Sequence, residues 1–398
     1  MPQTLDPLAL MTKLISFPTV SRDTNLPLVE WVADYLGTHG IEAHLWPDPN
    51  QPHKAALFAH VGPWEEGAVV LSGHMDVVPI DGQDWTTDPW SVTERDGTYV
   101  GRGTCDMKGF DALAIWALVE AQARGVTKPL QLALSFDEEI GCTGAPPLIR
   151  AMDEKLPRGA AVIVGEPSTM QAVTGHKGGQ GYPTHVKGFE VHSSIAYQGV
   201  SAIHEAARLI EWANRMNDEA AAATPGPMAA MFDPPYTSWH VGMIEGGTAH
   251  NITAKDCTFA MGFRAVPGDD PAALKQMYMG EVARLRASIQ AVRPEADIEV
   301  EVMFDVPALQ PEGLGGVSGV SADKAGQAEA LVRQITGDNG SHVVSYGTEA
   351  GHFQSAGYSA VVCGPGDIAQ AHQPDEFITI PQFEAGHQFM RDLVQRLA

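Results

Sequence analysis

Residues 67–76 read GAVVLSGHMD, a run of small and β-branched apolar residues that ends abruptly in a histidine and an aspartate. An uninterrupted apolar run of this kind is typical of a buried strand in a parallel sheet. Two later runs have the same form: LQLALSF at 130–136, which a pair of glutamates soon follows, and AAVIVG at 160–165, which one glutamate follows. Because the carboxyl ends of parallel strands meet at one edge of an open α/β sheet, where sites are built, we expect these polar side chains to lie together.

Seven residues form the candidate site. They are carboxylates and imidazoles, the O and N ligands of hard and borderline divalent metals. Two of the seven follow other patterns: one aspartate lies between the glycine-rich GRGT and a predicted helix, and one histidine lies in the late segment AQAHQPDE. The set is His74, Asp76, Asp106, Glu138, Glu139, Glu166 and His372.

The neighbouring carboxylates Glu138 and Glu139 are the most informative pair. At the end of a buried strand they repel each other unless a cation offsets their charge. One of them can bind a metal while the other, pointing elsewhere, acts as a general base. A shared carboxylate with one histidine and one glutamate on each side binds two divalent ions, and a bridging water then serves as the nucleophile. The pattern therefore predicts a metallohydrolase.

Each residue also has a structural interpretation. A lone histidine such as His74 is usually a satisfied core residue, and an acid before a helix, such as Asp106, is equally a helix N-cap. Asp76 lies two residues after His74, so both face the same way on an extended segment, and Asp76 can fix the imidazole from behind. A small buried packing residue explains Cys105 better than a ligand or a nucleophile. The number of ligand-type residues in one domain nevertheless favours the metal site.

The composition narrows the class of protein. A chain of 398 residues is too long for one ordinary core, so we expect two domains. The formal net charge of −24 disfavours binding to nucleic acid and to anionic membranes. The four cysteines contain no CxxC pair, which suits a reducing compartment and argues against a structural zinc knot. The sequence has no signal-peptide pattern and no apolar run of membrane length, so we expect a cytoplasmic protein.

The order of the elements predicts the architecture. Strand and helix patterns alternate up to residue 178, which indicates a mainly parallel sheet flanked by helices. From 179 to 304 the strands alternate polar and apolar residues around two long helices, as in a small α+β domain with an antiparallel sheet. The ligand-type residues skip this block and resume at His372. We therefore expect an α/β catalytic domain of residues 1–178 and 305–398, with residues 179–304 inserted into it.

The periodicity also predicts individual elements. The expected helices span residues 6–17, 26–40, 106–123, 202–216 and 270–289. The expected strands span residues 41–46, 68–72, 130–136, 160–164, 180–188, 257–264 and 298–306.

Several stretches resemble the motifs of one known family. They are SGHMDVVP, GRGTCDMKGF, SFDEEIGCTGA, GEPS, GGTAHNITA, YGTEAGHF and the late AHQPDEF. With these motifs, which run through essentially the whole chain, the sequence resembles the M20 family of di-zinc peptidases and deacylases. The resemblance implies a phosphorylase/hydrolase-like catalytic domain, interrupted by a lid domain that mediates formation of a homodimer. It also implies two divalent metal ions, with zinc expected, while N and O ligands admit cobalt or manganese as well.

The resemblance gives the seven candidate residues separate roles: five metal ligands, one general base and one supporting carboxylate. Asp106 would bridge the two ions, and Glu138 would be the base. The other assignments are His74 and Glu166 for one ion, Glu139 and His372 for the other, and Asp76 behind the ligands.

Three residues of the inserted block match positions that act on the substrate. His192, in GFEVHSSIAYQGVSA, resembles a histidine that polarises the scissile carbonyl, often that of the partner subunit's site. Asn251 and Arg264 match positions that hold the substrate carboxylate, to which a guanidinium can donate two parallel hydrogen bonds. Without the resemblance, His192 is a histidine of a surface strand and Arg264 a structural ion-pair residue. The chain departs from the family pattern at residues 179–180 and 195–197, which leaves the substrate less determined than the metal site.

The substrate implied by the resemblance is a small N-acyl amino acid, and in particular N2-acetyl-L-ornithine, hydrolysed to L-ornithine and acetate. Glu349 in YGTEAGHF distinguishes this chain from related desuccinylases, and its carboxylate either reads the ammonium of ornithine or caps neighbouring loop amides. Desuccinylase, aminoacylase and dipeptidase activities are the alternatives within the family. A non-catalytic metal-binding protein is the alternative of a different class, and Glu138 argues against it. A serine hydrolase is disfavoured because no GxSxG elbow occurs.

Overall fold

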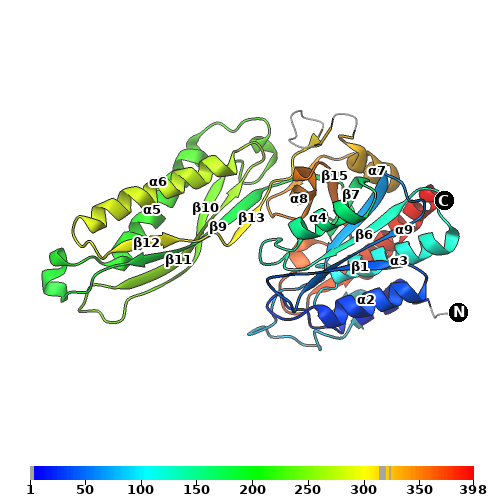
Figure 1. The fold of residues 1–398 in the computed structure, drawn as a ribbon, viewed down its shortest axis with the longest axis horizontal. Helices are drawn as coiled ribbons and strands as arrows, with labels where there is room; N and C mark the ends of the chain where they lie inside the picture. Colours follow the sequence, from blue (N-terminus) through cyan, green and yellow to red (C-terminus); the bar gives the residue numbers. More distant parts are fainter. Residues whose placement is uncertain (1–3, 313–319, 322–323) are drawn as a thin grey trace. The chain divides into compact units, whose positions relative to one another are not determined.

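The computed structural model of the chain describes residues 4–312, 320–321 and 324–398, and it contains two compact units (Figure 1). The first unit comprises Met1–Gly175, Leu309–His342 and Thr348–Ala398. The second unit comprises His176–Ala308 together with the short segment Val343–Gly347. The sequence pattern placed the divisions after residues 178 and 304 and gave no sign of the short returning segment.

The first unit is built around a large sheet whose centre is parallel. The strands β6, β3, β7 and β15 are neighbours in that order and all three pairings between them are parallel. Antiparallel strands extend both sides of this centre. The full order is β1 (Ala43–Pro47), β2 (Ala55–Val61), β6 (Leu130–Ser135), β3 (Ala68–His74), β7 (Gly159–Pro167), β15 (Ser359–Gly364), β8 (Val173–His176) and β14 (His342–Val344). The predicted α/β class with a mainly parallel central sheet is confirmed.

Every residue of β3 is buried, although successive side chains along a strand point to opposite faces. Helices therefore cover both faces of this sheet. In Figure 1, α3 (cyan) and α9 (red) pack against each other. Local signals set the ends of the helices: the Asp6 carboxylate caps α1 by accepting from the Ala9 N–H, and α3 ends at the left-handed Gly125. The helices are α1 (Pro7–Ile15), α2 (Leu26–Thr38), α3 (Lys108–Arg124), α4 (Ala145–Lys155), α7 (Gln327–Thr336), α8 (Ala350–Ser355) and α9 (Ile380–Leu397).

The first unit also contains a small three-stranded sheet. Its strands are close in sequence to two segments of the candidate site described below. Its order is β16 (Phe377–Thr379), β5 (Thr98–Val100) and β4 (Thr93–Arg95), and both pairings are antiparallel. The pairing of β16 with β5 joins the C-terminal region to the segment that precedes α3. The single-turn helix η4 (Ile368–Gln370) comes shortly before β16.

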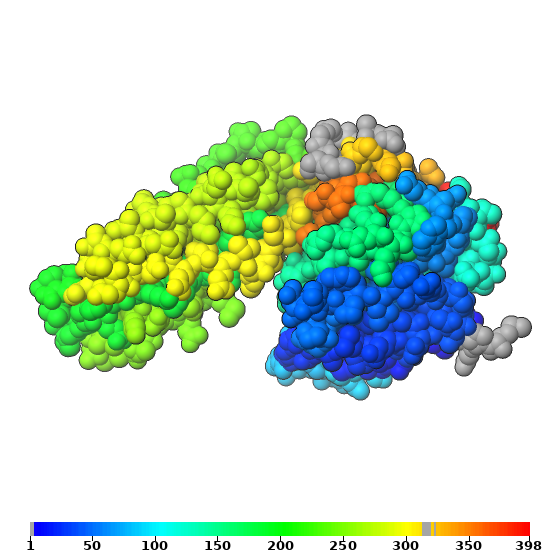
Figure 2. Space-filling view, in the orientation of Figure 1, coloured from blue at the N-terminus to red at the C-terminus, as the bar shows by residue number. Residues whose placement is uncertain are grey.

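The second unit is an antiparallel sheet with two long helices. The sheet order is β10 (Ser238–Gly246), β11 (Asp256–Ala265), β9 (Gly178–Lys187) and β12 (Asp297–Val300), and β13 (Phe304–Val306) also pairs with β9. The helices α5 (Ala202–Ala222) and α6 (Pro271–Gln290) pack on it around a core rich in aromatic side chains, and Figure 2 shows α6 (yellow) at the surface of this unit. The short helices are η1 (Ser193–Gln198) and η2 (Ala229–Met231).

Among the residues that the structure describes, no helix is both long enough and apolar enough to cross a membrane.

Candidate metal centre

Three neighbouring parallel strands bring the predicted acids and the first histidine together. His74 is the last residue of β3 and is level with Ser135, the last residue of β6, in their parallel register. Glu138 comes three residues after the end of β6. Glu166 lies near the end of β7, which pairs with the other side of β3. The apolar runs thus end at one sheet edge, as the sequence predicted.

Asp106 lies at the middle of the cluster. Its Oδ1 is 3.0 Å from Nε2 of His74, and its Oδ2 is 3.1 Å from Nε2 of His372. Each imidazole also faces one glutamate: His74 Nε2 is 3.5 Å from Glu166 Oε1, and His372 Nε2 is 2.9 Å from Glu139 Oε2. The cluster is therefore nearly symmetric about the Asp106 carboxylate.

Two groups of donor atoms are compact enough to hold a cation. The first contains His74, Asp106 and Glu139, and the second contains His74, Glu138 and Glu166. Within each group all the donor atoms lie within 4.8 Å of one another. Glu138 is therefore as close to the cluster as the other acids, and distance alone does not separate a base from a ligand.

The buried acids of this cluster carry more negative charge than the neighbouring groups offset. Glu139 Oε1 and Glu166 Oε1 are buried and accept no hydrogen bond from any residue that the structure describes. Burial raises the pKa of Glu138 to about 8 and that of Glu139 to about 7, and it raises the pKa of Glu166 well above its ordinary value. Neighbouring carboxylates reinforce each of these shifts. Buried oxygens without a donor are the kind of group that a cation satisfies.

The histidines respond to the same excess of negative charge. Hydrogen bonds to Asp106 and Glu139 raise the pKa of His372 to about 10. Burial opposes protonation of His74, but its hydrogen bonds to Asp106 and Asp76 still raise its pKa well above the ordinary value. A divalent cation would supply the positive charge that the protonated imidazoles otherwise provide, and the N and O donor set suits zinc and similar ions. The residues therefore fit a metal centre.

Asp76 supports the cluster from behind. Its Oδ1 accepts a hydrogen bond from the Glu138 N–H at 3.1 Å, and its Oδ2 accepts from the Glu139 N–H at 3.4 Å and from the Ser21 hydroxyl at 2.6 Å. The backbone carbonyl of Asp76 lies 3.0 Å from Nδ1 of His74. Asp76 thus fixes both the imidazole and the backbone of the glutamate pair, which outer residues of metal sites commonly do.

The structural alternatives for two residues can be decided. The N-cap position of α3 is Met107, and no side chain caps this helix, so Asp106 is not a helix cap. Cys105 is buried, and burial raises the pKa of its thiol far above the ordinary value, as expected of a packing residue rather than a nucleophile. All four cysteines are buried and free.

Glu349 lies close to the strand ends but does not cap a loop. It is only 1% exposed and has no capping hydrogen bond at the start of α8. One of its carboxylate oxygens accepts from the Ser135 hydroxyl, and the other accepts from the Ser72 hydroxyl at 3.3 Å. Burial raises its pKa to about 7. Both oxygens therefore already have partners, on the strands that lead to His74 and to the glutamate pair.

The three predicted substrate residues of the inserted block lie in the second unit. His192 is exposed, and its Nδ1 accepts a hydrogen bond from the Ser194 N–H at 3.2 Å. The backbone carbonyl of the exposed Asn251 accepts from the Ser193 N–H at 2.9 Å. The exposed Arg264 places its guanidinium carbon 6.0 Å from the centre of the Phe304 ring. Their action on a substrate stays a prediction.

Sequence reasoning missed two buried ion pairs that hold the loops of the centre. Lys54 pairs with Asp137, the residue before Glu138, and both side chains are almost fully buried. Arg102 pairs with Glu376 at 2.7 Å, and both are buried as well. The available signals were a lysine directly before the apolar run AALFAHV and an acid four residues after His372. Neither signal identifies its partner, because the partners are distant in sequence.

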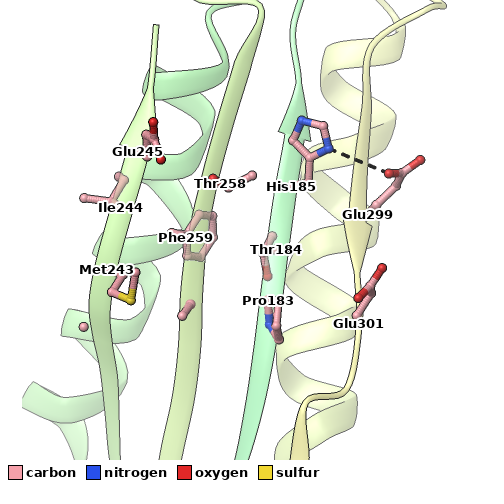
Figure 3. Close-up of a pocket in the computed structure, with 12 residues that line it drawn as sticks. Pro183, Thr184, His185, Met243, Ile244, Glu245, Thr258, Phe259, Glu299 and Glu301 are labelled. Atoms are coloured by element: carbon pink, nitrogen blue, oxygen red, sulfur yellow. Dashed lines mark ion pairs between the residues drawn. The ribbon is translucent and has the colours of Figure 1, made fainter. Parts of the chain in front are cut away.

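A hollow of about 860 Å³ lies on one face of the sheet of the second unit (Figure 3). Figure 3 shows side chains of β9, β10 and β11 on this face, with helices behind the strands. The hollow contains Glu245, Glu299 and Glu301, and His185 faces Glu299 at 3.8 Å. It shares no residue with the metal centre, so we do not assign it to a reaction.

Comparison with known proteins identifies the family of the chain. The sequence pattern of Peptidase family M20/M25/M40 matches residues 70–396. An acetylornithine deacetylase of Myxococcus xanthus is 33% identical over 94% of this chain and 92% of its own length. One of Yersinia pseudotuberculosis serotype O:1b is 32% identical over 96% of this chain and 95% of its own length.

Solved structures show the same fold. The M20 family metallo-carboxypeptidase Sso-CP2 of Sulfolobus solfataricus has a TM-score of 0.76 at 16% identity, with 98% of this chain and 99% of that chain covered. A dinuclear metal-binding M20 peptidase of Bacillus subtilis has a TM-score of 0.62 at 14% identity, with 98% and 97% covered. Because the family pattern covers most of the chain and the sequence relatives span nearly its full length, the chain belongs to peptidase family M20/M25/M40 and is a hydrolase.

Proposed function

We propose that this hydrolase cleaves the amide bond of N-acyl amino acids and that its substrate is N2-acetyl-L-ornithine, which it converts to L-ornithine and acetate. The observation that carries the proposal is the Asp106 carboxylate, with one oxygen against His74 and the other against His372. A carboxylate placed between two histidine–glutamate pairs could bridge two metal ions, and two-metal sites carry out hydrolysis. The acetylornithine deacetylases among the relatives support the choice of substrate.

The five ligand residues would hold two ions, which we propose to be zinc. His74 and Glu166 would hold one ion, and Glu139 and His372 the other, with Asp106 between them. When bound, such ions lower the pKa of a water molecule and act as Lewis acids. Cobalt and manganese are the alternatives that the same donors accept.

The chain's own residues would carry the protons and hold the substrate. Glu138 takes a proton from the attacking water, the hydroxide adds to the acyl carbon, and Glu138 returns the proton to the amine as the C–N bond breaks. His192 would donate a hydrogen bond to the acyl oxygen, where negative charge develops. Asn251 and Arg264 would hold the α-carboxylate of the substrate. Together with the five ligands, these roles account for the polar residues that the sequence singled out, except Asp76 and Glu349.

A substrate panel tests the proposed function. Purified protein with measured metal content is assayed with N2-acetyl-L-ornithine, N-acetyl-L-methionine, N-succinyl-diaminopimelate and a dipeptide. We expect the highest kcat/KM for N2-acetyl-L-ornithine. A higher kcat/KM for the succinylated substrate or the dipeptide would replace this assignment with another activity of the family. Metal binding without turnover of any of the four would mean that the hydrolase acts on a different substrate, and would contradict this proposal.

We further propose that the protein works in the cytoplasm as a homodimer formed through the second unit, which would serve as the lid. Light scattering coupled to size-exclusion chromatography tests the dimer. A mass close to the 42.5 kDa of one chain at all concentrations would contradict it.

Replacing Glu349 by glutamine separates two roles for this residue. Because both oxygens of Glu349 are occupied by serine hydroxyls, we expect E349Q to lower kcat/KM for N2-acetyl-L-ornithine and N-acetyl-L-methionine by similar factors, about tenfold for one lost charged hydrogen bond. The measurement is the ratio of the two kcat/KM values. A loss confined to the ornithine substrate would instead show that Glu349 reads the ammonium group.

A further inference from the structure

Glu376 accepts hydrogen bonds from three backbone amides of the loop that carries Asp106. Its side chain is 1% exposed, and its Oε1 accepts hydrogen bonds from the N–H groups of Gly103, Cys105 and Asp106, each at 3.0 Å. Three amides on one carboxylate oxygen fix the direction of the backbone at Asp106. The sequence places Glu376 only four residues after His372, so one short segment supplies both a proposed ligand and this anchor.

A second series of hydrogen bonds connects the other carboxylate oxygen of Glu376 to the backbone of His372. Oε2 accepts from Nη1 of Arg102 at 2.7 Å, and Nη2 of Arg102 donates to Oε1 of Gln83 at 2.5 Å. Nε2 of Gln83 then donates to the backbone carbonyl of His372 at 3.0 Å. The hydrogen bonds thus form a continuous path from the Asp106 amide, through Glu376, Arg102 and Gln83, to the backbone of His372.

Backbone pairing strengthens the same link. The N–H of Gly101 donates to the carbonyl of Glu376 at 2.9 Å, and Phe377 pairs with Val100 where β16 meets β5. The segment with His372 and the loop with Asp106 are therefore also joined through the backbone of Glu376 and Phe377. The 3.1 Å separation between His372 Nε2 and Asp106 Oδ2 depends on how these two segments are held.

We infer that Glu376 is a positioning residue that sets the separation of Asp106 and His372 and thereby the metal affinity of the centre. The inference rests on the proposed metal centre. A buried ion pair is weak grounds for a role in stability, since well-packed apolar residues often serve stability as well. The three amides, the arginine and the path to His372 instead account for a carboxylate at this position. Loss of such an outer contact typically lowers metal affinity about 10- to 100-fold.

The test compares E376Q with D375N, a matched control at the next residue. Asp375 contacts Thr86 and Arg95 near the surface and has no bond to the loop of Asp106. Metal-free wild type and both variants are titrated with Zn²⁺, and with Co²⁺ to record the visible absorption of the bound ion. We expect D375N to match the wild type, and E376Q to bind about 10- to 100-fold more weakly with an altered Co²⁺ spectrum.

The outcomes separate the inference from the proposed function. If the wild type binds neither ion, the proposed metal centre itself is wrong. If the wild type binds both ions and folded E376Q has the same affinity and spectrum, Glu376 serves only the fold and the inference is overturned. If E376Q does not fold, Q83A decides, because Gln83 lies on a partly exposed loop and its loss interrupts the path to His372. Weaker Zn²⁺ binding by Q83A would support the inference, and unchanged binding would overturn it.

Discussion

We expect glutamine in place of Glu138 to lower kcat by about 10²- to 10⁴-fold, the usual contribution of a general acid–base residue, while the protein still binds metal. Glutamine fills the same space but cannot take the proton from the attacking water. Glu138 lies in a donor group with His74 and Glu166, next to the proposed ligand Glu139, and burial raises its pKa to about 8. The measurement is kcat for the purified variant alongside its metal content.

Glutamine at Glu139 is the contrasting variant. Glu139 faces His372 at 2.9 Å, and we propose it as a ligand rather than the base. E139Q should therefore bind less metal, and E138Q should bind as much as the wild type. Near-normal turnover of metal-loaded E138Q would contradict the role of Glu138. Loss of metal from E138Q but not from E139Q would mean that the two glutamates exchange roles.

We expect removal of metal by a chelator to abolish hydrolysis and to lower the thermal midpoint of the first unit, and we expect added Zn²⁺ or Co²⁺ to restore both. The stabilisation comes from binding to the folded state alone and amounts to about 2.7 kcal/mol when the free ion is at 100 times its Kd. The physical reason is that Oε1 of Glu139 and Oε1 of Glu166 are buried and have no hydrogen-bond donor among the residues that the structure describes. The midpoint is followed by calorimetry at several concentrations of free ion.

Asp106→Asn provides the control for metal removal. Its side chain has a similar shape but keeps only one oxygen and no negative charge, so it cannot serve both His74 and His372 in the same way. We expect its midpoint to depend much less on added Zn²⁺ than that of the wild type. Full activity of the chelated wild type would refute metal dependence.

The strands that form the centre could be predicted because their signal is local. The apolar runs that end before His74, Glu138 and Glu166 became β3, β6 and β7 of one parallel sheet. The single strand expected over 298–306 was wrong. It forms two strands that pair with different parts of β9, a break that the alternation of residues does not reveal.

The contacts behind the centre could not be predicted, because they join segments that are distant in sequence. Arg102 and Glu376 are separated by 274 positions, and neither lies in a periodic pattern that points to the other. The same holds for the ion pair of Lys54 and Asp137, because a lysine before a strand gives no indication of a buried partner. Burial and pairing of such residues depend on the packing of the whole unit rather than on local propensity.

The position of His372 has a consequence for the order of events during synthesis. His74, Asp106, Glu139 and Glu166 all precede the inserted second unit in the chain, whereas His372 follows it. Domains begin to fold from the N-terminal side as the ribosome releases them. A nascent chain that ends after the second unit therefore has the proposed donors for one ion and only part of those for the other. The complete centre can take up both ions only once the last part of the chain has left the ribosome.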